Sequence, residues 1–137
     1  MKPATAFVWT VRVYWEDTDA GGMVYYANYL KFFERARTEW LRSLGVGQRA
    51  LHVTTGGMFV VSEAQVRYLQ SARLDDELLV TTTRLALGRA SLTLLQQAHR
   101  VQTTQPVLLC QAQIRAGWID QHGKAARIPP DILQRIT

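Results

Sequence analysis

Acidic residues and glycines cluster near the N-terminus, in the segment EDTDAGGMVYYANY at residues 16–29. Asp17, Asp19, Gly21 and Gly22 are all turn-forming types, so a simple strand-to-helix connection explains them without any chemistry. Their position supports a second interpretation. Glycines let the backbone approach a ligand closely, and a helix that starts just after them presents unpaired N–H groups. A carboxylate beside such donors is the minimum required to attack an activated acyl group.

The acidic segment lies between a predicted strand and a predicted helix. Residues 7–15 alternate apolar with more polar side chains, which is typical of a half-buried strand. After the glycines, apolar residues recur at helical spacing, and Gly45 follows as a C-terminal cap. We expect one helix of about 17 residues, roughly 25 Å long. Its apolar positions are Tyr26, Tyr29, Leu30, Phe33, Ala36, Trp40, Leu41 and Leu44.

The rest of the chain is rich in β-branched and aromatic residues, so no second helix of comparable length is expected. Four strands are predicted, at residues 58–70, 76–87, 90–101 and 105–120, and their short connections favour antiparallel neighbours. The C-terminal RIPPDILQRI predicts the end of the last strand and one helical turn. Residues 1–137 therefore form a single α+β domain, a curved antiparallel sheet around one helix. Because such a sheet has exposed edges, we expect an oligomer.

Composition narrows the function classes. Sixteen Lys and Arg against eleven Asp and Glu give a net charge of +5, which favours anionic partners. The single cysteine, Cys110, excludes an intramolecular disulfide framework, and no Cys/His spacing suggests a metal site. No stretch approaches the roughly 20 apolar residues of a membrane span, so a soluble cytoplasmic protein is expected.

A family resemblance extends the chemical interpretation. The stretch RVYWEDTDAGGMVYYANYLKFFERARTEWLRSLG resembles the signature of hotdog-fold acyl-CoA thioesterases of the 4-hydroxybenzoyl-CoA thioesterase type, closest to the YbgC-like, Tol–Pal-associated branch. The similarity continues more weakly through VVSEAQVRYLQSARLDDELLV to about residue 120. The resemblance implies a helix wrapped by an antiparallel sheet and dimers with active sites at the subunit interface, commonly assembled into tetramers. The spacing that carries it is D-x-D-x-x-G-x-V-x-x-x-x-Y, formed by Asp17, Asp19, Gly22, Val24 and Tyr29.

The resemblance also assigns roles to individual residues. Asp19, the second acid of the pair, corresponds to the catalytic carboxylate, and the Tyr26 backbone N–H corresponds to the donor that polarises the thioester carbonyl. Asp17 is then structural, as a turn or cap acceptor, while Gly22 and Tyr29 lie where substrate binds. The branch often carries histidine where this chain has Tyr26, a change that keeps the backbone donor and loses any role of the histidine side chain.

A basic turn is implied to bind the coenzyme A phosphates. By resemblance this is LGRASL, with Arg89 as the main contact, Ser91 as a minor contact and Arg73 as an alternative. By resemblance, another hotdog branch uses a carboxylate about as far along the helix as Glu34. Because Glu34 is flanked by Lys31, Arg35 and Arg37, an ordinary helix-surface ion pair is the favoured interpretation. No cofactor is expected, since coenzyme A is part of the substrate, and the thioester carrier is either coenzyme A or acyl carrier protein.

Other function classes remain as alternatives. One is a non-catalytic hotdog module that binds acyl groups or docks onto acyl carrier protein. The presence of Asp19 argues against it, because a buried carboxylate beside an acyl carbonyl is costly unless it has a chemical role. A nucleic-acid reader is disfavoured because the arginines are scattered rather than arranged in a stripe with stacking aromatics. A hotdog dehydratase would need a histidine beside the acids, and His52, His99 and His122 are all distant in sequence.

Overall fold

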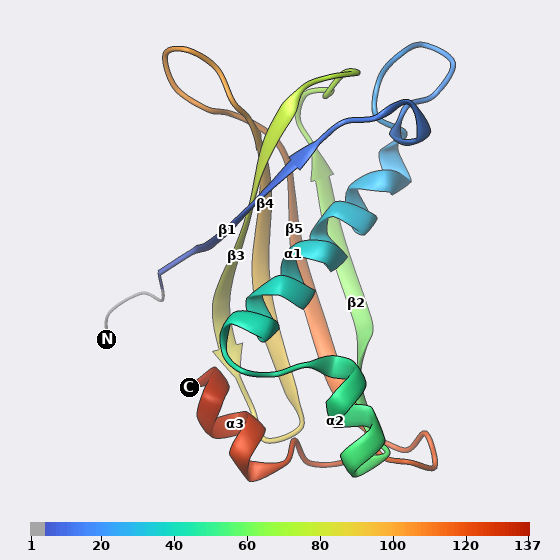
Figure 1. The fold of residues 1–137 in the computed structure, drawn as a ribbon, viewed down its shortest axis with the longest axis vertical. Coiled ribbons are helices and arrows are strands. Elements are labelled where there is room, and N and C mark those ends of the chain that lie inside the picture. Colours follow the sequence, from blue (N-terminus) through green and yellow to red (C-terminus); the bar gives the residue numbers. More distant parts are fainter. Residues whose placement is uncertain (1–4) are drawn as a thin grey trace.

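The computed structural model describes residues 5–137 and contains one five-stranded antiparallel sheet. The strand order across the sheet is β1-β3-β4-β5-β2, and Figure 1 shows it curving beside a long helix. This arrangement confirms the predicted α+β architecture. The strands are β1 (Phe7–Arg12), β2 (Met58–Tyr68), β3 (Glu77–Leu87), β4 (Ser91–Arg100) and β5 (Val107–Ile119).

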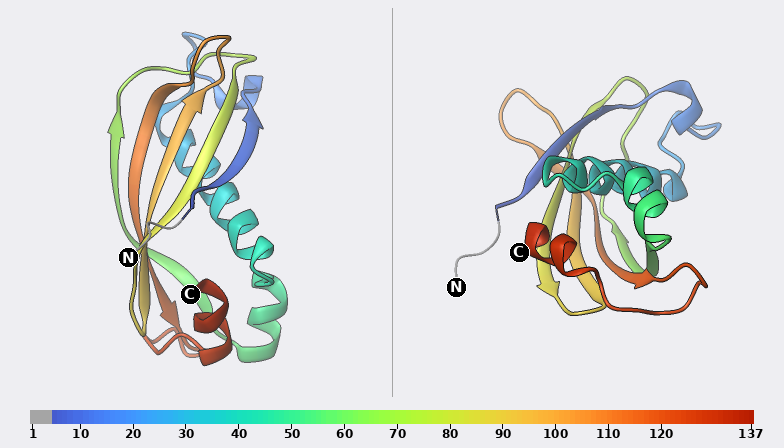
Figure 2. Two further views of the ribbon diagram at one scale, coloured as in Figure 1. Left: turned by 90° about the vertical axis from the view of Figure 1, so that its left-hand side faces the viewer. Right: turned by 60° about the horizontal axis from the view of Figure 1, so that its bottom comes forward.

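Helix α1 (Tyr29–Ser43) crosses one face of the sheet, as the two views in Figure 2 show. Alternate residues of β4 and β5 are buried, which is the period of two expected when one sheet face is covered. Phe32 and Phe33 of α1 are fully buried against this face. Each Å² of apolar surface that is removed from water stabilises the fold by about 25 cal/mol. The packing of these side chains therefore holds α1 against the sheet.

The boundaries of the first elements differ from prediction. β1 ends at Arg12 rather than residue 15, because residues Trp15–Asp17 form a 3₁₀ turn. The predicted helix start at Tyr26 is a second 3₁₀ turn, Tyr26–Asn28, and α1 proper has 15 residues. Gly45 has a positive φ of 82° just after α1, so its predicted capping position is confirmed.

Two short helices differ from the sequence prediction. Helix α2 (Gln48–Thr55) begins after Gly47 and ends at Gly56, whose φ is 74°. Gln48 to Leu51 are good helix formers, but Val53 to Thr55 are β-branched and no residue of the helix is buried, so no apolar stripe marks it in the sequence. Helix α3 (Pro130–Ile136) is longer than the single predicted turn and buries Ile132 and Ile136.

Strands β1 and β2 are the two edges of the sheet, since each pairs with only one other strand. Within residues 5–137, no helix has both the length and the apolar character needed to cross a membrane. Cys110 is buried on β5, and burial raises the pKa of its thiol to about 12, which keeps it neutral, as expected of a structural cysteine.

Candidate active site

The acidic segment folds into a tight hairpin between β1 and α1. Thr18 bridges Val24, and the Asp19 N–H donates to the Met23 carbonyl oxygen at 2.8 Å. The Gly22 N–H closes the turn on the Asp19 carbonyl oxygen at 3.1 Å, and Gly22 itself has a φ of 77°. Glycine adopts this left-handed conformation without strain, which explains the residue type at position 22.

The Asp19 carboxylate is held at one oxygen only. Its Oδ1 accepts hydrogen bonds from the Gly21 N–H at 2.9 Å and the Met23 N–H at 3.3 Å. Its Oδ2 accepts none from the described part of the chain, and the residue is exposed. A Cβ on Gly21 would lie only 3.3 Å from Asp19 Oδ1, so glycine leaves room for the carboxylate. Asp19 therefore presents a fixed and accessible oxygen.

The 3₁₀ turn at Tyr26–Asn28 presents unpaired backbone donors. The Tyr25 N–H donates to the Asp17 carbonyl oxygen at 2.9 Å, and the Asn28 N–H donates to the Tyr25 carbonyl oxygen at 2.8 Å. Between them, the N–H groups of Tyr26 and Ala27 have no acceptor among residues 5–137, as expected at the start of a helical turn. The Tyr26 side chain is 62% exposed. Two adjacent donors are thus available to a ligand oxygen.

Asp17 has the structural role predicted for it. It is only 4% exposed, and its Oδ2 accepts from the Tyr14 N–H at 2.8 Å while its Oδ1 accepts from the Asn28 side-chain amide at 2.9 Å. The two acids of the motif therefore differ in their surroundings. Both oxygens of Asp17 accept hydrogen bonds inside the protein, whereas Asp19 is exposed.

Tyr29 is buried at the start of α1, where its hydroxyl accepts from the Ala72 N–H at 3.0 Å. Burial raises the pKa of this hydroxyl. Its ring lies 5.9 Å from that of Tyr68, which also meets the Tyr26 ring at 5.9 Å. These three tyrosines line a small open cavity of about 180 Å³ beside the helix start. Tyr29 thus contributes to the surface near the Tyr26 donor.

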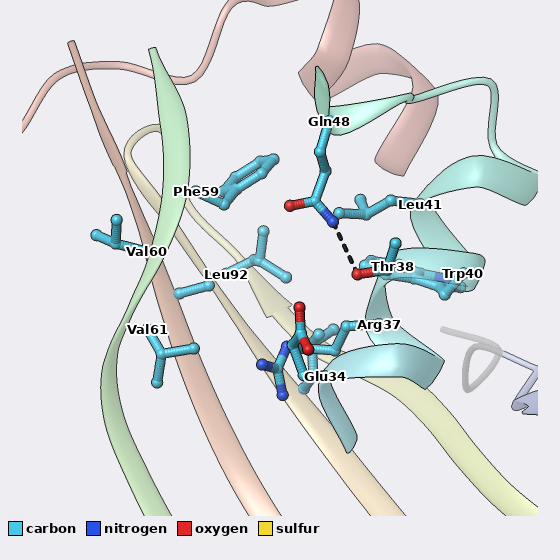
Figure 3. Close-up of a pocket in the computed structure, with 12 residues that line it drawn as sticks. Glu34, Arg37, Thr38, Trp40, Leu41, Gln48, Phe59, Val60, Val61 and Leu92 are labelled. Atoms are coloured by element: carbon cyan, nitrogen blue, oxygen red, sulfur yellow. Dashed lines mark hydrogen bonds between the residues drawn. The ribbon is translucent and has the colours of Figure 1, made fainter. Parts of the chain in front are cut away.

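A second cavity, of about 170 Å³, lies between the C-terminal half of α1 and β2, as Figure 3 shows. Its volume is comparable to that of an engineered cavity of about 150 Å³ that binds benzene. Gln48 of α2 donates to the Thr38 hydroxyl at 3.0 Å across one side of it. Most of its wall is apolar, formed by Trp40, Leu41, Phe59, Val60, Val61, Leu92, Leu94 and Ala116.

Glu34 and Arg37 are the charged residues of this cavity wall. The prediction that Glu34 belongs to a helix-surface ion pair is wrong for the described residues: their ion pairs are Arg12–Glu77, Arg42–Glu39 and Arg100–Asp76. Glu34 lines the cavity together with Arg37, its neighbour three residues along the helix, although their charged atoms do not come within ion-pair distance. Arg37 donates to the Gln96 side-chain oxygen at 2.9 Å, and burial lowers the pKa of its guanidinium. Sequence periodicity alone did not reveal this cavity, because it depends on the separation between α1 and β2.

Arg89 and Ser91 lie at the opposite end of the sheet from Asp19. Arg89 belongs to the β3–β4 turn and Ser91 is the first residue of β4, whereas the Asp19 hairpin contacts the segment before β3 through the Met23–Arg73 bridge. The 11 residues of β3 separate these ends, roughly 30 Å at 3.3 Å per residue. Figure 1 shows the two segments at the top and bottom of the fold. One chain therefore does not bring all the predicted site residues together.

A second arginine, Arg127, lies next to Arg89 and was not predicted from the sequence. The Ile128 N–H donates to the Arg89 carbonyl oxygen at 2.8 Å, which places the backbone at exposed Arg127 next to Arg89. The run KAAR at residues 124–127, with two basic residues, was the sequence feature that could have indicated it. Arg73, the alternative to Arg89, is exposed and lies at the Asp19 end of the sheet instead. Among residues 5–137, no group of three or more His, Cys, Asp or Glu side chains has the arrangement of a metal site.

The sequence of the chain is similar to those of known thioesterases. The family model of the thioesterase-like superfamily matches residues 13–136. The acyl-CoA thioester hydrolase YbgC of Escherichia coli O6:H1 is 43% identical over 116 residues, which cover 85% of this chain and 84% of that protein.

Solved structures give the same fold. A probable thioesterase from Bartonella henselae superposes with a TM-score of 0.81 at 30% identity, covering 91% of this chain and 100% of that one. A 4-hydroxybenzoyl CoA thioesterase mutant complexed with 4-hydroxybenzoyl CoA gives a TM-score of 0.89 at 19% identity, covering 96% and 99%. This second likeness concerns the fold alone, and together they confirm the predicted hotdog arrangement.

Proposed function

The chain belongs to the thioesterase-like superfamily and is a thioesterase, and from this premise we propose that it hydrolyses acyl-CoA thioesters with Asp19 as its reactive carboxylate. The observation that carries the proposal is the hairpin itself. An anchored carboxylate with one free oxygen and a turn with two unpaired N–H groups are joined through the same short segment. These are the two parts that acyl transfer requires.

The free oxygen of Asp19 serves in one of two ways. It attacks the thioester carbonyl carbon, forming a mixed anhydride and releasing the coenzyme A thiolate, and water then hydrolyses the anhydride. Alternatively it takes a proton from a water molecule that attacks the same carbon directly. In both routes the carbonyl oxygen becomes negatively charged, and the Tyr26 N–H stabilises that charge. A thiolate is a competent leaving group, so no strong general acid is required.

The complete site requires two chains. Strand β2 is a free edge, and pairing two copies of β2 in antiparallel fashion places the Tyr68 end of one chain beside the Met58 end of its partner. The Tyr68 end carries the Tyr26 donor, while the other end carries the cavity at Phe59. In this dimer the acyl group occupies the partner's cavity while Asp19 attacks its carbonyl. Further assembly to a tetramer stays a prediction.

The same pairing accounts for the position of Arg89. In a single chain Arg89 is remote from Asp19, but across the antiparallel pair it approaches the Asp19 hairpin of the other chain. Arg89, with Arg127 beside it, binds the coenzyme A phosphates through its guanidinium, and Ser91 contributes a minor contact. A carrier protein with an acidic surface would contact the same basic residues.

The test is thiol release from acyl-CoA esters of graded length and polarity, measured with wild type and Asp19→Asn at equal oligomeric state. We expect turnover by wild type and its loss in the variant, since an amide is neither nucleophile nor base here. The acyl preference of wild type then reports the size of the cavity. Wild-type turnover by Asp19→Asn would refute the role of Asp19. Background rates in both would instead favour an acyl-binding module, which parallel assays with acyl carrier protein thioesters would check.

A further inference from the structure

Two of the four buried polar residues among residues 5–137 lie directly under the proposed site. These four are Asp17, Asn28, Thr82 and Gln96. Thr82 and Gln96 bond to each other in the sheet, whereas Asp17 and Asn28 bond to each other between the hairpin and the start of α1. No cationic group of residues 5–137 lies within 4 Å of the Asp17 carboxylate, and a buried carboxylate without such a partner is costly compared with an apolar pair of the same shape. Its presence calls for a function that apolar packing does not supply.

The hydrogen bonds around this pair fix both ends of the donor turn. Asp17 holds Tyr25 through its carbonyl oxygen at 2.9 Å and Asn28 through its Oδ1 at 2.9 Å. Tyr26 and Ala27, whose N–H groups are unpaired, lie between these two attachment points. The direction of the Tyr26 N–H therefore depends on Asp17 and Asn28, although neither side chain offers an atom to a ligand.

Asp17 also connects the donor turn to the reactive carboxylate. Its Oδ2 accepts from Tyr14 at 2.8 Å, which holds the incoming backbone, and Asp19 follows only two residues later in the hairpin closed by the Thr18–Val24 bridge. The buried amide–carboxylate contact between Asn28 and Asp17 is thus one of the contacts that set the position of the Asp19 oxygen relative to the Tyr26 N–H. A misplacement of about 1 Å in such a geometry can cost about 100-fold in rate.

We propose that Asn28, through its hydrogen bond to Asp17, is a positioning residue that aims the Tyr26 N–H at the developing oxyanion. This inference rests on the proposed function, because it assumes that Asp19 and the Tyr26 N–H act on the thioester. The effect comes from the hydrogen bond rather than from the negative charge of Asp17. Since the pair acts on the transition state only by positioning the Tyr26 N–H relative to Asp19, its loss lowers kcat and leaves KM nearly unchanged.

The first variant is Asn28→Leu, which keeps the side-chain volume and removes the donor. We expect kcat to fall about 10- to 100-fold, with KM within about twofold of wild type. Asp17→Asn is the matched control. Rotation of the Asn28 amide lets its oxygen accept from the new amide, whose own oxygen still accepts from Tyr14, so both hydrogen bonds survive without the charge. We expect this control to keep kcat within about threefold.

A charge exchange tests the same contact without an apolar substitution, in case Asn28→Leu does not fold. Asn28→Asp alone places two carboxylates against each other and should lower kcat, because like charges at this distance repel. Adding Asp17→Asn restores one amide and one carboxylate and should recover most of the lost kcat. Thermal unfolding of each variant shows that the protein assayed is folded.

Three results would overturn the inference, and the first two are wild-type kcat in folded Asn28→Leu and no recovery in the double exchange variant. An equal loss in Asp17→Asn and Asn28→Leu would also refute it, because it would assign the effect to charge. Asp19→Asn, assayed in parallel, separates this failure from failure of the proposed function. If Asp19→Asn is inactive while Asn28→Leu turns over normally, only the positioning role is wrong.

Discussion

Tyr26 contributes its backbone rather than its side chain to the proposed chemistry. Its ring is largely exposed and contacts the rings of Tyr25 and Tyr68. Its N–H, in contrast, starts a 3₁₀ turn and has no acceptor in the described chain. A different side chain at this position, such as the histidine common in the branch, therefore leaves the donor in place.

Proline at position 26 removes this donor selectively. Tyr25 has φ −58° and ψ 129°, a conformation that the residue before proline adopts readily, and the first position of a helical turn tolerates proline. We expect Tyr26→Pro to lower kcat about 10²- to 10³-fold, the typical cost of losing one oxyanion donor. Tyr26→Phe, which keeps the N–H, should change kcat only modestly. Steady-state kinetics on one acyl-CoA ester measure both, and equal effects would assign the role to the side chain.

At the scale of elements, the hydrophobic periodicity of the sequence predicted the strands and the helix that are buried on one side. The alternation along β4 and the apolar stripe of α1 identified the sheet and its covering helix, because both patterns reflect burial on one side. Helix α2 was not predicted, since it is short, its last three residues are β-branched and none of its residues is buried, so it has no apolar stripe to identify it. The cavity between α1 and β2 was not predicted either, because the residues of its wall come from segments that are far apart in the sequence.

Gln96 joins α1 to the sheet through three hydrogen bonds. Its side chain is fully buried, accepts from Arg37, and donates to the Phe33 carbonyl oxygen and the Thr82 hydroxyl. Gln96→Leu keeps the volume but leaves a charged donor unpaired, so we expect the free energy of unfolding to fall by about 2–4 kcal/mol. Urea denaturation measures this change. Gln97→Leu, which removes a single half-buried bond to Gln111, should cost less than about 1.5 kcal/mol, and equal losses would contradict the assignment.

At the scale of the whole molecule, the position of Arg89 could not be deduced from the chain alone. The sequence motif and the family resemblance assigned Asp19 and Arg89 to one site, while β3 separates them by roughly 30 Å in one chain. We propose that a second copy resolves this conflict, since β2 is an edge strand that pairs only with β5 in the described chain. The proposed site thus depends on assembly as much as on folding.

Mixed oligomers test this dependence directly. Asp19→Asn should be inactive, and Arg89→Ala should raise KM for acyl-CoA through loss of a phosphate contact. In a heterodimer of the two variants, a site shared between chains combines the intact Asp19 of one with the intact Arg89 of the other. Differently tagged chains, coexpressed and purified as the heterodimer, should then show about half of wild-type activity per dimer at low substrate, because one of its two sites is intact. Activity no higher than half that of the Arg89→Ala homodimer would place both residues' effects within one chain and contradict the shared site.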